Sequence, residues 1–238
     1  MINFFRKLRH EFLGKKKFSK YIKYALGEIL LVVIGILIAL QINNWNENRK
    51  NEANTVLMLK QLKEENLSNL SDLLEGKPNR DSLSLKTRAF INFLRTTDSI
   101  ETIERTKCHL SFQLQSESYS FTENALTRYL NSNVNENSIL IKELVELQSY
   151  QKNLAYISEK AMDSRFENVF NFLINDVDYS TLEIHSLEKL KSFEFRNKLN
   201  LTLVIESAVN SQFYRTFKQQ QKMDSILSSY LKKQEFIK

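Results

Sequence analysis

Hydrophobic residues are most densely grouped in one stretch near the start of the chain. Residues 25–42 read ALGEILLVVIGILIALQI and contain one charged residue, Glu28. At about 1.5 Å per residue, an α-helix of this length spans roughly 27 Å, close to the hydrocarbon thickness of a bilayer. The pattern therefore predicts a transmembrane helix over residues 25–42.

Beyond residue 43 the apolar residues become periodic, and only one glycine and one proline remain, Gly76 and Pro78. Helical spacing of apolar residues predicts helices over residues 56–74, 81–95, 122–131 and 138–175. The helix over 138–175 has two adjacent apolar faces, which is typical of a helix in the middle of a bundle. A long last helix has one apolar face, formed by Phe195, Leu199, Val209, Phe213, Phe217, Leu227 and Leu231.

Local signals place the ends of these helices. Gly76 followed by Pro78 predicts the end of the helix over 56–74, which can continue from the membrane span because residues 43–55 contain no helix breaker. Asp81 or Ser82, Thr122 and Ser138 are expected N-caps. We expect a short helix with loops over 96–120, where SFQLQSESYSF alternates like a strand, breaks at 133–137 and 176–180, and a short helix within 182–191.

Together these patterns predict an all-α protein with a single N-terminal transmembrane helix followed by an antiparallel helical bundle. The domains are a basic cytoplasmic segment over residues 1–24, the span over 25–42, and one extracytoplasmic helical domain over 43–238. About 190 residues are enough for a single packed core.

Charge determines the expected orientation of the span. Residues 1–24 carry a net charge of +7, residues 25–44 carry −1 from Glu28, and the whole chain carries +6, so residues 45–238 are neutral. The positive-inside rule keeps the basic end in the cytoplasm. Tyr24 and Trp45 fit the aromatic belts at the two membrane edges. The lysines expected to fix topology at the inner surface are Lys15, Lys16, Lys17, Lys20 and Lys23.

Two alternatives concern this basic segment. A cleaved signal peptide would need small residues after the apolar run, whereas the chain continues as Gln41-Ile42-Asn43-Asn44-Trp45, so an uncleaved anchor is favoured. Residues 2–13 read equally as an amphipathic interfacial helix or as a disordered basic tail. A pI near 9.2 suggests nucleic-acid binding, but the excess charge lies in the first 24 residues, so no nucleic acid is expected as a partner.

Within the span, Glu28, Gly35 and Ala39 share one side of the helix at 100° per residue. A small-xxx-small pair allows close helix approach, so this face is a candidate seam for a homodimer. Glu28 is by default a candidate for a proton path or a polar partner. Its place near the inner edge also fits a carboxylate at headgroup level, within reach of Lys20 and Lys23.

The stretch over residues 4–50 resembles the N-terminal signature of a family of uncharacterised bacterial proteins. These share a basic FFRK-type start, a span similar to GEILLVVIGILIALQINNWNE, and a mostly helical domain of unknown function. The resemblance implies a single-pass protein of the inner (plasma) membrane of a Gram-negative cell, with its C-terminal domain in the periplasm. It implies no activity, because the family has none assigned.

Catalytic and metal-binding signatures are absent from the sequence. His10, His109 and His185 are isolated, with no HExxH-type spacing, and neither a GxSxG elbow nor a glycine-rich phosphate loop occurs. Cys108 is single, so we expect a half-buried structural thiol or an intermolecular disulfide. Glu64 and Glu65 near Lys60 and Lys63 read as a solvated helix face. No cofactor and no metal are therefore expected.

Two function classes remain. The favoured one is a non-enzymatic module of the cell envelope that interacts with, or acts as a scaffold for, an unidentified envelope protein. The alternative is an enzyme or small-ligand sensor whose site is not recognisable from sequence. The missing catalytic constellation favours the first class.

Overall fold

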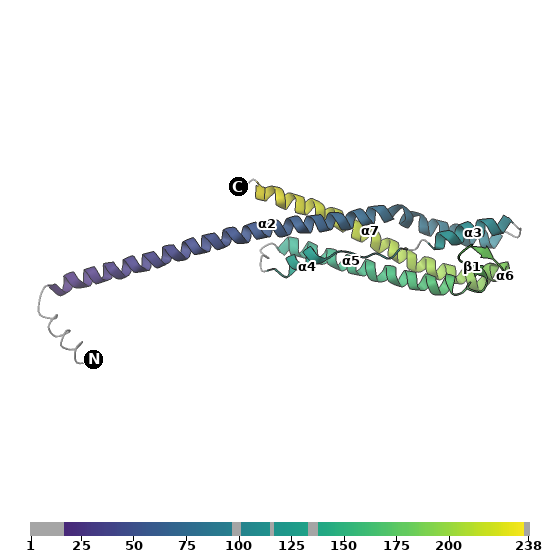
Figure 1. The fold of residues 1–238 in the computed structure, drawn as a ribbon, viewed down its shortest axis with the longest axis horizontal. Coiled ribbons are helices and arrows are strands. Elements are labelled where there is room, and N and C mark those ends of the chain that lie inside the picture. The colour runs from purple at the N-terminus through teal and green to yellow at the C-terminus, as the bar shows by residue number, and fades with distance from the viewer. Residues whose placement is uncertain (1–16, 97–100, 115–116, 133–137, 236–238) are drawn as a thin grey trace, which may run out of the picture. The chain divides into compact units, whose positions relative to one another are not determined.

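The protein is described by a computed structural model that covers residues 17–96, 101–114, 117–132 and 138–235. The chain divides into two compact units, residues 1–55 and 56–238. The described residues are almost entirely helical, which confirms the predicted all-α class (Figure 1). The helices are α2 (Lys17–Thr96), α3 (Glu101–Gln113), α4 (Asn124–Leu130), α5 (Ser138–Arg165), the π-helix η1 (Phe166–Phe170), α6 (Leu187–Lys191) and α7 (Phe193–Glu235).

The first unit contains the apolar stretch as part of α2. One window of 18 residues in this helix has a mean hydropathy of 2.5, long and apolar enough to cross a membrane, and none of it is buried. The large side chains of residues 29–42 are all exposed, for example Leu31 at 73% and Ile29 at 62%. The helix therefore has no protein cover on any side along this stretch.

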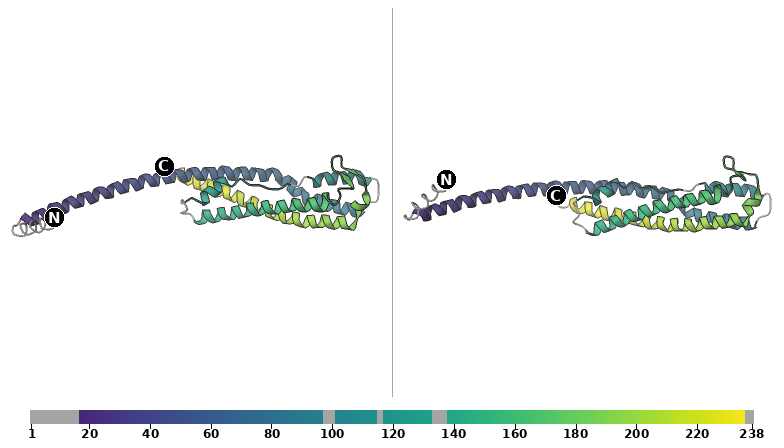
Figure 2. Two further views of the ribbon diagram at one scale, coloured as in Figure 1. Left: turned by 60° about the horizontal axis from the view of Figure 1, so that its bottom comes forward. Right: turned by 90° about the horizontal axis from the view of Figure 1, so that it is seen from below.

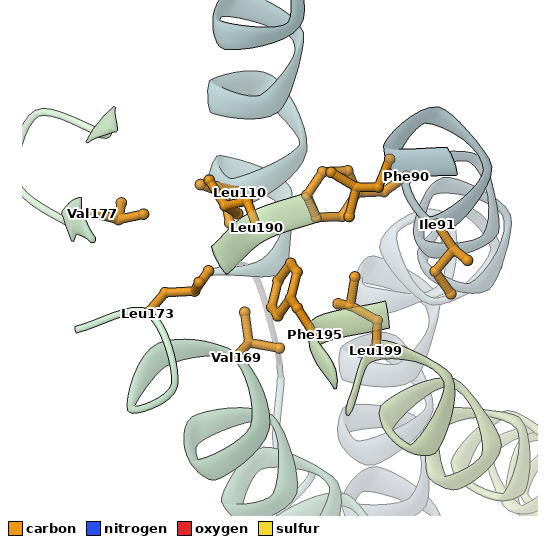
Figure 3. Close-up of a cluster of buried hydrophobic side chains, with 10 residues drawn as sticks. Phe90, Ile91, Leu110, Val169, Leu173, Val177, Leu190, Phe195 and Leu199 are labelled. Atoms are coloured by element: carbon orange, nitrogen blue, oxygen red, sulfur yellow. The ribbon is translucent and has the colours of Figure 1, made fainter. Parts of the chain in front are cut away.

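The second unit contains three clusters of buried side chains along its length. The Leu62 cluster contains Leu59, Leu62, Leu126, Tyr129, Leu140, Leu144, Leu147, Met223 and Leu227. The Phe213 cluster contains Leu73, Leu154, Ala161, Val209, Phe213 and Phe217. The Phe195 cluster contains Phe90, Ile91, Leu94, Leu110, Val169, Leu173, Val177, Leu190, Phe195 and Leu199, with Phe195 at its centre (Figure 3).

The order of residues in these clusters gives the chain directions. α2 and α5 both run from the Leu62 cluster to the Phe195 cluster, and α7 runs back beside α5 (Figures 1 and 2). Between α2 and α5 the chain returns through α3, an extended segment over residues 117–123, and α4. These consecutive segments are thus antiparallel, although the second one is only partly helical. The helices predicted over 56–74 and 81–95 are not antiparallel neighbours, because both belong to α2.

The predicted helix end at Gly76 is wrong, because α2 continues through Gly76 and Pro78 to Thr96. Pro78 has no N–H to donate to the carbonyl of Leu74. The helix persists because both sides of this point are anchored, by Leu73 in the Phe213 cluster and by Phe90 in the Phe195 cluster. A Cβ atom on the buried Gly76 would lie 2.9 Å from Glu117 Oε2. Glycine here permits close approach of the returning segment and is not a helix terminator.

Two predicted caps are also wrong. Asp81 and Ser82 lie inside α2 and cap nothing. The N-cap of α4 is Glu123, which makes no side-chain cap bond, and Thr122 lies one residue further back. The carboxylate of Glu65 in α2 instead accepts the amides of Ala125 at 2.7 Å and Leu126 at 3.0 Å. Glu65 is therefore the cap of α4 and is not part of a solvated face.

The end of α5 differs from the prediction as well. The α-helix ends at Arg165, and the chain continues as the π-helix η1 and turns instead of an α-helix to residue 175. Met162 and Phe166 are exposed. An antiparallel hairpin with two residues in each strand pairs β1 (Val177–Asp178) with β2 (Glu183–Ile184). Leu182, in the loop between the strands, has a φ of 57°. Only residues 187–191 of the short helix predicted within 182–191 are α-helical. The predicted turn over residues 133–137 lies outside the described residues.

Candidate functional site

The residues predicted to mark the membrane edges lie on the exposed first unit. Lys15 and Lys16 lie outside the described residues, and Lys17 and Lys20 belong to α2. Lys23 and Tyr24 are exposed, and so is Trp45, at 64%. The guanidinium carbon of Arg49 lies 5.5 Å from the centre of the Trp45 ring. Such a cation–π pair suits an interface where one side of the ring is apolar and the other polar.

The three residues of the candidate dimer face are also exposed. Glu28 borders a shallow, open apolar groove on α2, lined by Ala25, Glu28, Ile29, Val32 and Val33. Gly35 has no atom within 4 Å of an added Cβ, so a larger side chain would meet nothing in the monomer. Ala39 is exposed one turn further along. The helical repeat places all three residues on one side of α2.

A charged triad lies inside the bundle, between the Phe213 and Phe195 clusters. It joins Arg80 of α2, Arg165 of α5 and Glu206 of α7, whose exposed fractions are 5%, 0% and 1%. Arg80 Nη2 donates to Glu206 Oε2, and Arg165 Nη2 donates to Glu206 Oε1. One carboxylate thus joins the three long helices by a charged hydrogen bond on each oxygen.

Neutral polar groups extend the triad to the returning segment. Arg165 Nη1 donates to the carbonyl of Gln113 at 3.1 Å, and Gln113 Nε2 donates to Thr87 Oγ1 at 3.0 Å. The Nε atoms of Arg80 and Arg165 and the Oε1 atom of Gln113 are buried without a hydrogen-bond partner. Burial lowers the pKa of Arg165, which the charge of Glu206 opposes.

A narrow cleft opens beside this triad. It is lined by Asn79, Arg80, Leu83, Phe112, Glu117 and Tyr119, and offers about 10 Å³, the room of one water molecule. Glu117 lies at its exposed rim, where Oε1 accepts from Asn79 Nδ2 at 3.0 Å. Burial raises the pKa of Tyr119 to about 12. A cleft of this size has room for a water molecule and is too small for an organic substrate.

A proline and a π-helical turn lie beside the triad in the two helices that carry its arginines. Pro78 precedes Arg80 by two residues in α2, and η1 begins directly after Arg165 in α5. π-Turns and interior prolines persist where surrounding contacts hold them. Here Glu206 bonds to both arginines, and the flanking clusters pack each helix on either side.

The histidines and the cysteine singled out in the sequence lie at ordinary positions where the structure describes them, and His10 lies outside the described residues. The ring of His109 stacks on Phe90 with a centroid distance of 4.9 Å, whereas the neighbouring Cys108 is exposed. His185 is also exposed, in the segment after β2. Within the described ranges, no group of three or more His, Cys, Asp or Glu side chains is placed to hold a metal ion.

Sequence reasoning missed the triad, although a signal for it exists. Glu206 occurs between Leu199 and Val209 on the apolar face of the last helix, and Arg165 occurs between Ala161 and Val169. A charge inside an apolar stripe is costly when buried, so it indicates a partner of opposite charge. The identity of that partner requires the tertiary structure, because Arg80 and Glu206 are 126 positions apart.

Comparison with known proteins gives a family without an activity. The model of a family of unknown function, DUF6090, matches residues 28–207. This range is most of the chain, so the chain belongs to this family. No curated protein and no solved structure matches it.

Proposed function

We propose that this member of the DUF6090 family is a single-pass membrane protein whose helical bundle is a non-enzymatic interaction or scaffold module of the cell envelope. The N-terminus lies in the cytoplasm and residues 43–238 lie in the periplasm, on the far side of the inner membrane. The lipid bilayer is its first partner, and an envelope protein or a second copy of the chain is the next.

One observation carries the membrane part of the proposal. The most apolar window of α2 is 0% buried, whereas the core helix of a soluble protein would have much of such a window covered. A fully exposed apolar helix in water would be a strong aggregation liability. Acyl chains remove this cost, and the basic residues before the span favour one orientation.

The interior of the bundle supports a scaffold role. The charged groups of the triad are directed at one another, and the adjoining cleft has room for one water molecule. Buried polar contacts that join α2, α5 and α7 suit a bundle that must keep one arrangement. We therefore propose that the module acts through its surface and catalyses no reaction of its own.

Reporter fusions at Lys238 test the topology. An enzyme that is active only outside the cytoplasm should work at this position, and one that requires the cytoplasm should not. A control variant that changes Lys15, Lys16, Lys17, Lys20 and Lys23 to Gln should weaken the bias, because these residues supply most of the inner positive charge. Activity of the cytoplasmic reporter in the unmodified chain would contradict the proposed orientation.

A further inference from the structure

The extended segment over residues 117–123 differs from the other bundle elements in how it is held. It lies between α2 and α5 and pairs with no strand among the described residues. Its side chains alternate as in a β-strand: Tyr119 and Phe121 are half-buried, and Ser118, Ser120 and Thr122 are exposed. Apart from Glu123, whose carbonyl accepts from the amide of Thr127 at 2.9 Å at the start of α4, the contacts described below that fix it are tertiary.

Side chains of α2 and α5 form hydrogen bonds with its backbone. Asn69 of α2 accepts from the amide of Thr122 at 3.0 Å and donates to the carbonyl of the same residue at 2.9 Å. Ser158 of α5 accepts from the amide of Tyr119 at 3.0 Å. Backbone groups are the same in any sequence, so these contacts recognise an extended chain whatever its side chains are.

Selectivity comes from two alternate positions. Tyr119 and Phe121 pack against the Phe213 cluster, and the rings of Tyr119 and Phe213 lie 5.4 Å apart. Backbone hydrogen bonds combined with pockets for alternate side chains are the usual means of binding an extended peptide. At the start of the segment, Gly76 lets Glu117 come close to α2, and Asn79 holds its carboxylate.

We propose that the groove between α2 and α5 is a peptide-binding groove, that residues 117–123 are its built-in occupant, and that an extended segment of another protein with aromatic residues at alternate positions displaces it. The Tyr119-Ser120-Phe121 sequence, seated in the groove, is the template for that partner. The proposal names a partner class for the interaction role proposed above and does not depend on membrane insertion.

Departure of the resident segment leaves the long helices in place. α2, α5 and α7 keep their own i→i−4 hydrogen bonds, and none of residues 117–123 belongs to the Leu62 or Phe195 cluster, although the Phe213 cluster loses the cover of Tyr119 and Phe121. Both of its ends are covalently tied, which gives it a high effective concentration over the groove. A free peptide should therefore bind weakly to the unmodified chain and better when the resident segment is weakened.

The test uses the full chain in detergent micelles and a fluorescent synthetic peptide with the sequence of residues 117–123, ESYSFTE. The variant Tyr119→Ala/Phe121→Ala should bind this peptide at least about tenfold more tightly than the unmodified chain does. Adding Asn69→Ala should weaken binding about tenfold or more, because two hydrogen bonds are lost. Ser68→Ala, on the exposed side of the same turn, is the matched control and should change nothing. A peptide with both aromatic residues changed to Ala should not bind.

Three outcomes would overturn the proposal. The first is failure of a helical, monomeric double variant to bind the peptide, and the second is binding that is insensitive to Asn69→Ala. The third is a variant that dimerises by exchanging residues 117–123, which makes a second copy the occupant.

Hydrogen exchange on the unmodified chain tests the proposal even where the double variant does not fold. The amides of Tyr119 and Thr122 should exchange through a local opening, at least tenfold faster than buried amides of α5. Exchange of these amides only with global unfolding would contradict it. None of these results depends on the reporter fusions, so failure of the groove and failure of the proposed topology are distinguishable.

Discussion

The helix α2 has two parts that differ in where their apolar side chains lie. In residues 25–42 apolar side chains point to all sides, and Leu31 and Ile29 stay more than half exposed. In residues 56–96 they form a stripe, and Leu62, Leu73 and Phe90 are at most 1% exposed. The stripe over residues 56–96 packs against other helices of the bundle, whereas no described part of the protein covers residues 25–42. Apolar distribution, and not apolar content alone, separates a membrane segment from a bundle helix.

Two carboxylates sharpen this contrast. Glu206 is buried among apolar clusters and has an arginine on each oxygen. Glu28 lies in the most apolar stretch of the chain and is exposed on the surface of α2. The bundle supplies its own counter-charges, whereas in the proposed membrane span this role would fall to headgroup-level groups or to a neighbouring helix.

Removing residues 1–44 should produce the largest effect, a change from a membrane-bound to a soluble protein. We expect residues 45–238 to be soluble, strongly helical and cooperative on melting, because the clusters of the second unit are covered by one another. The full chain should stay in the membrane fraction. Circular dichroism and sedimentation of both forms check this. Insolubility of the shorter form would show that one of its apolar faces belongs to a partner or to the bilayer.

Glu206→Ala should be the most damaging single substitution in the bundle. It leaves two buried guanidinium groups without a counter-charge and should lower the free energy of unfolding by about 3–5 kcal/mol. The combined change Arg80→Met, Arg165→Met and Glu206→Leu should be far milder than Glu206→Ala, because it removes the charges together. Urea melts of residues 45–238 measure both.

The exposed Lys160–Asp163 pair is the matched control for the triad. Asp163→Asn should cost less than about 1 kcal/mol, since both side chains are more than half exposed. If Glu206→Ala costs as little as this surface change, water reaches the triad, and the contrast between the buried and the exposed carboxylate disappears.

How far the sequence predicted the fold depends on how local each signal was. The long helices, the antiparallel order and the buried face of α7 follow from apolar periodicity, and six of the seven residues predicted for that face are buried. The prediction that a helix ends at Gly76 was wrong because packing at Leu73 and Phe90 outweighs a local helix breaker. Periodicity does not connect positions that are more than 50 residues apart. It therefore did not predict the hydrogen bonds between Asn69 and Thr122 or the capping of α4 by Glu65.

A smaller effect is expected at the candidate dimer face of the span. Gly35→Ile adds a branched side chain where nothing lies within 4 Å in the monomer, so the fold should be unchanged. If two spans meet along Glu28, Gly35 and Ala39, loss of close backbone approach should weaken association roughly tenfold, or about 1.4 kcal/mol. Crosslinking in membranes measures this. Ile36→Val, a small change on the exposed helix, is the control, and only monomer in the unmodified chain would show that no such seam exists.

The smallest effect on stability is expected for Gly76→Ala. It separates two explanations of this glycine: that it ends a helix, or that it permits the close approach of Glu117. If Gly76 ended a helix in the left-handed conformation, Gly76→Ala would cost about 1 kcal/mol or more, because alanine is strained at a positive φ. In the structure Gly76 has no positive φ and lies inside α2. Alanine should therefore gain about 0.5–1 kcal/mol of helix preference, offset by movement of the Glu117 carboxylate 2.9 Å away. We expect a net change below about 1 kcal/mol in urea melts. Combining it with Glu117→Ala should make it stabilising, because the side chain that the new Cβ meets is then gone.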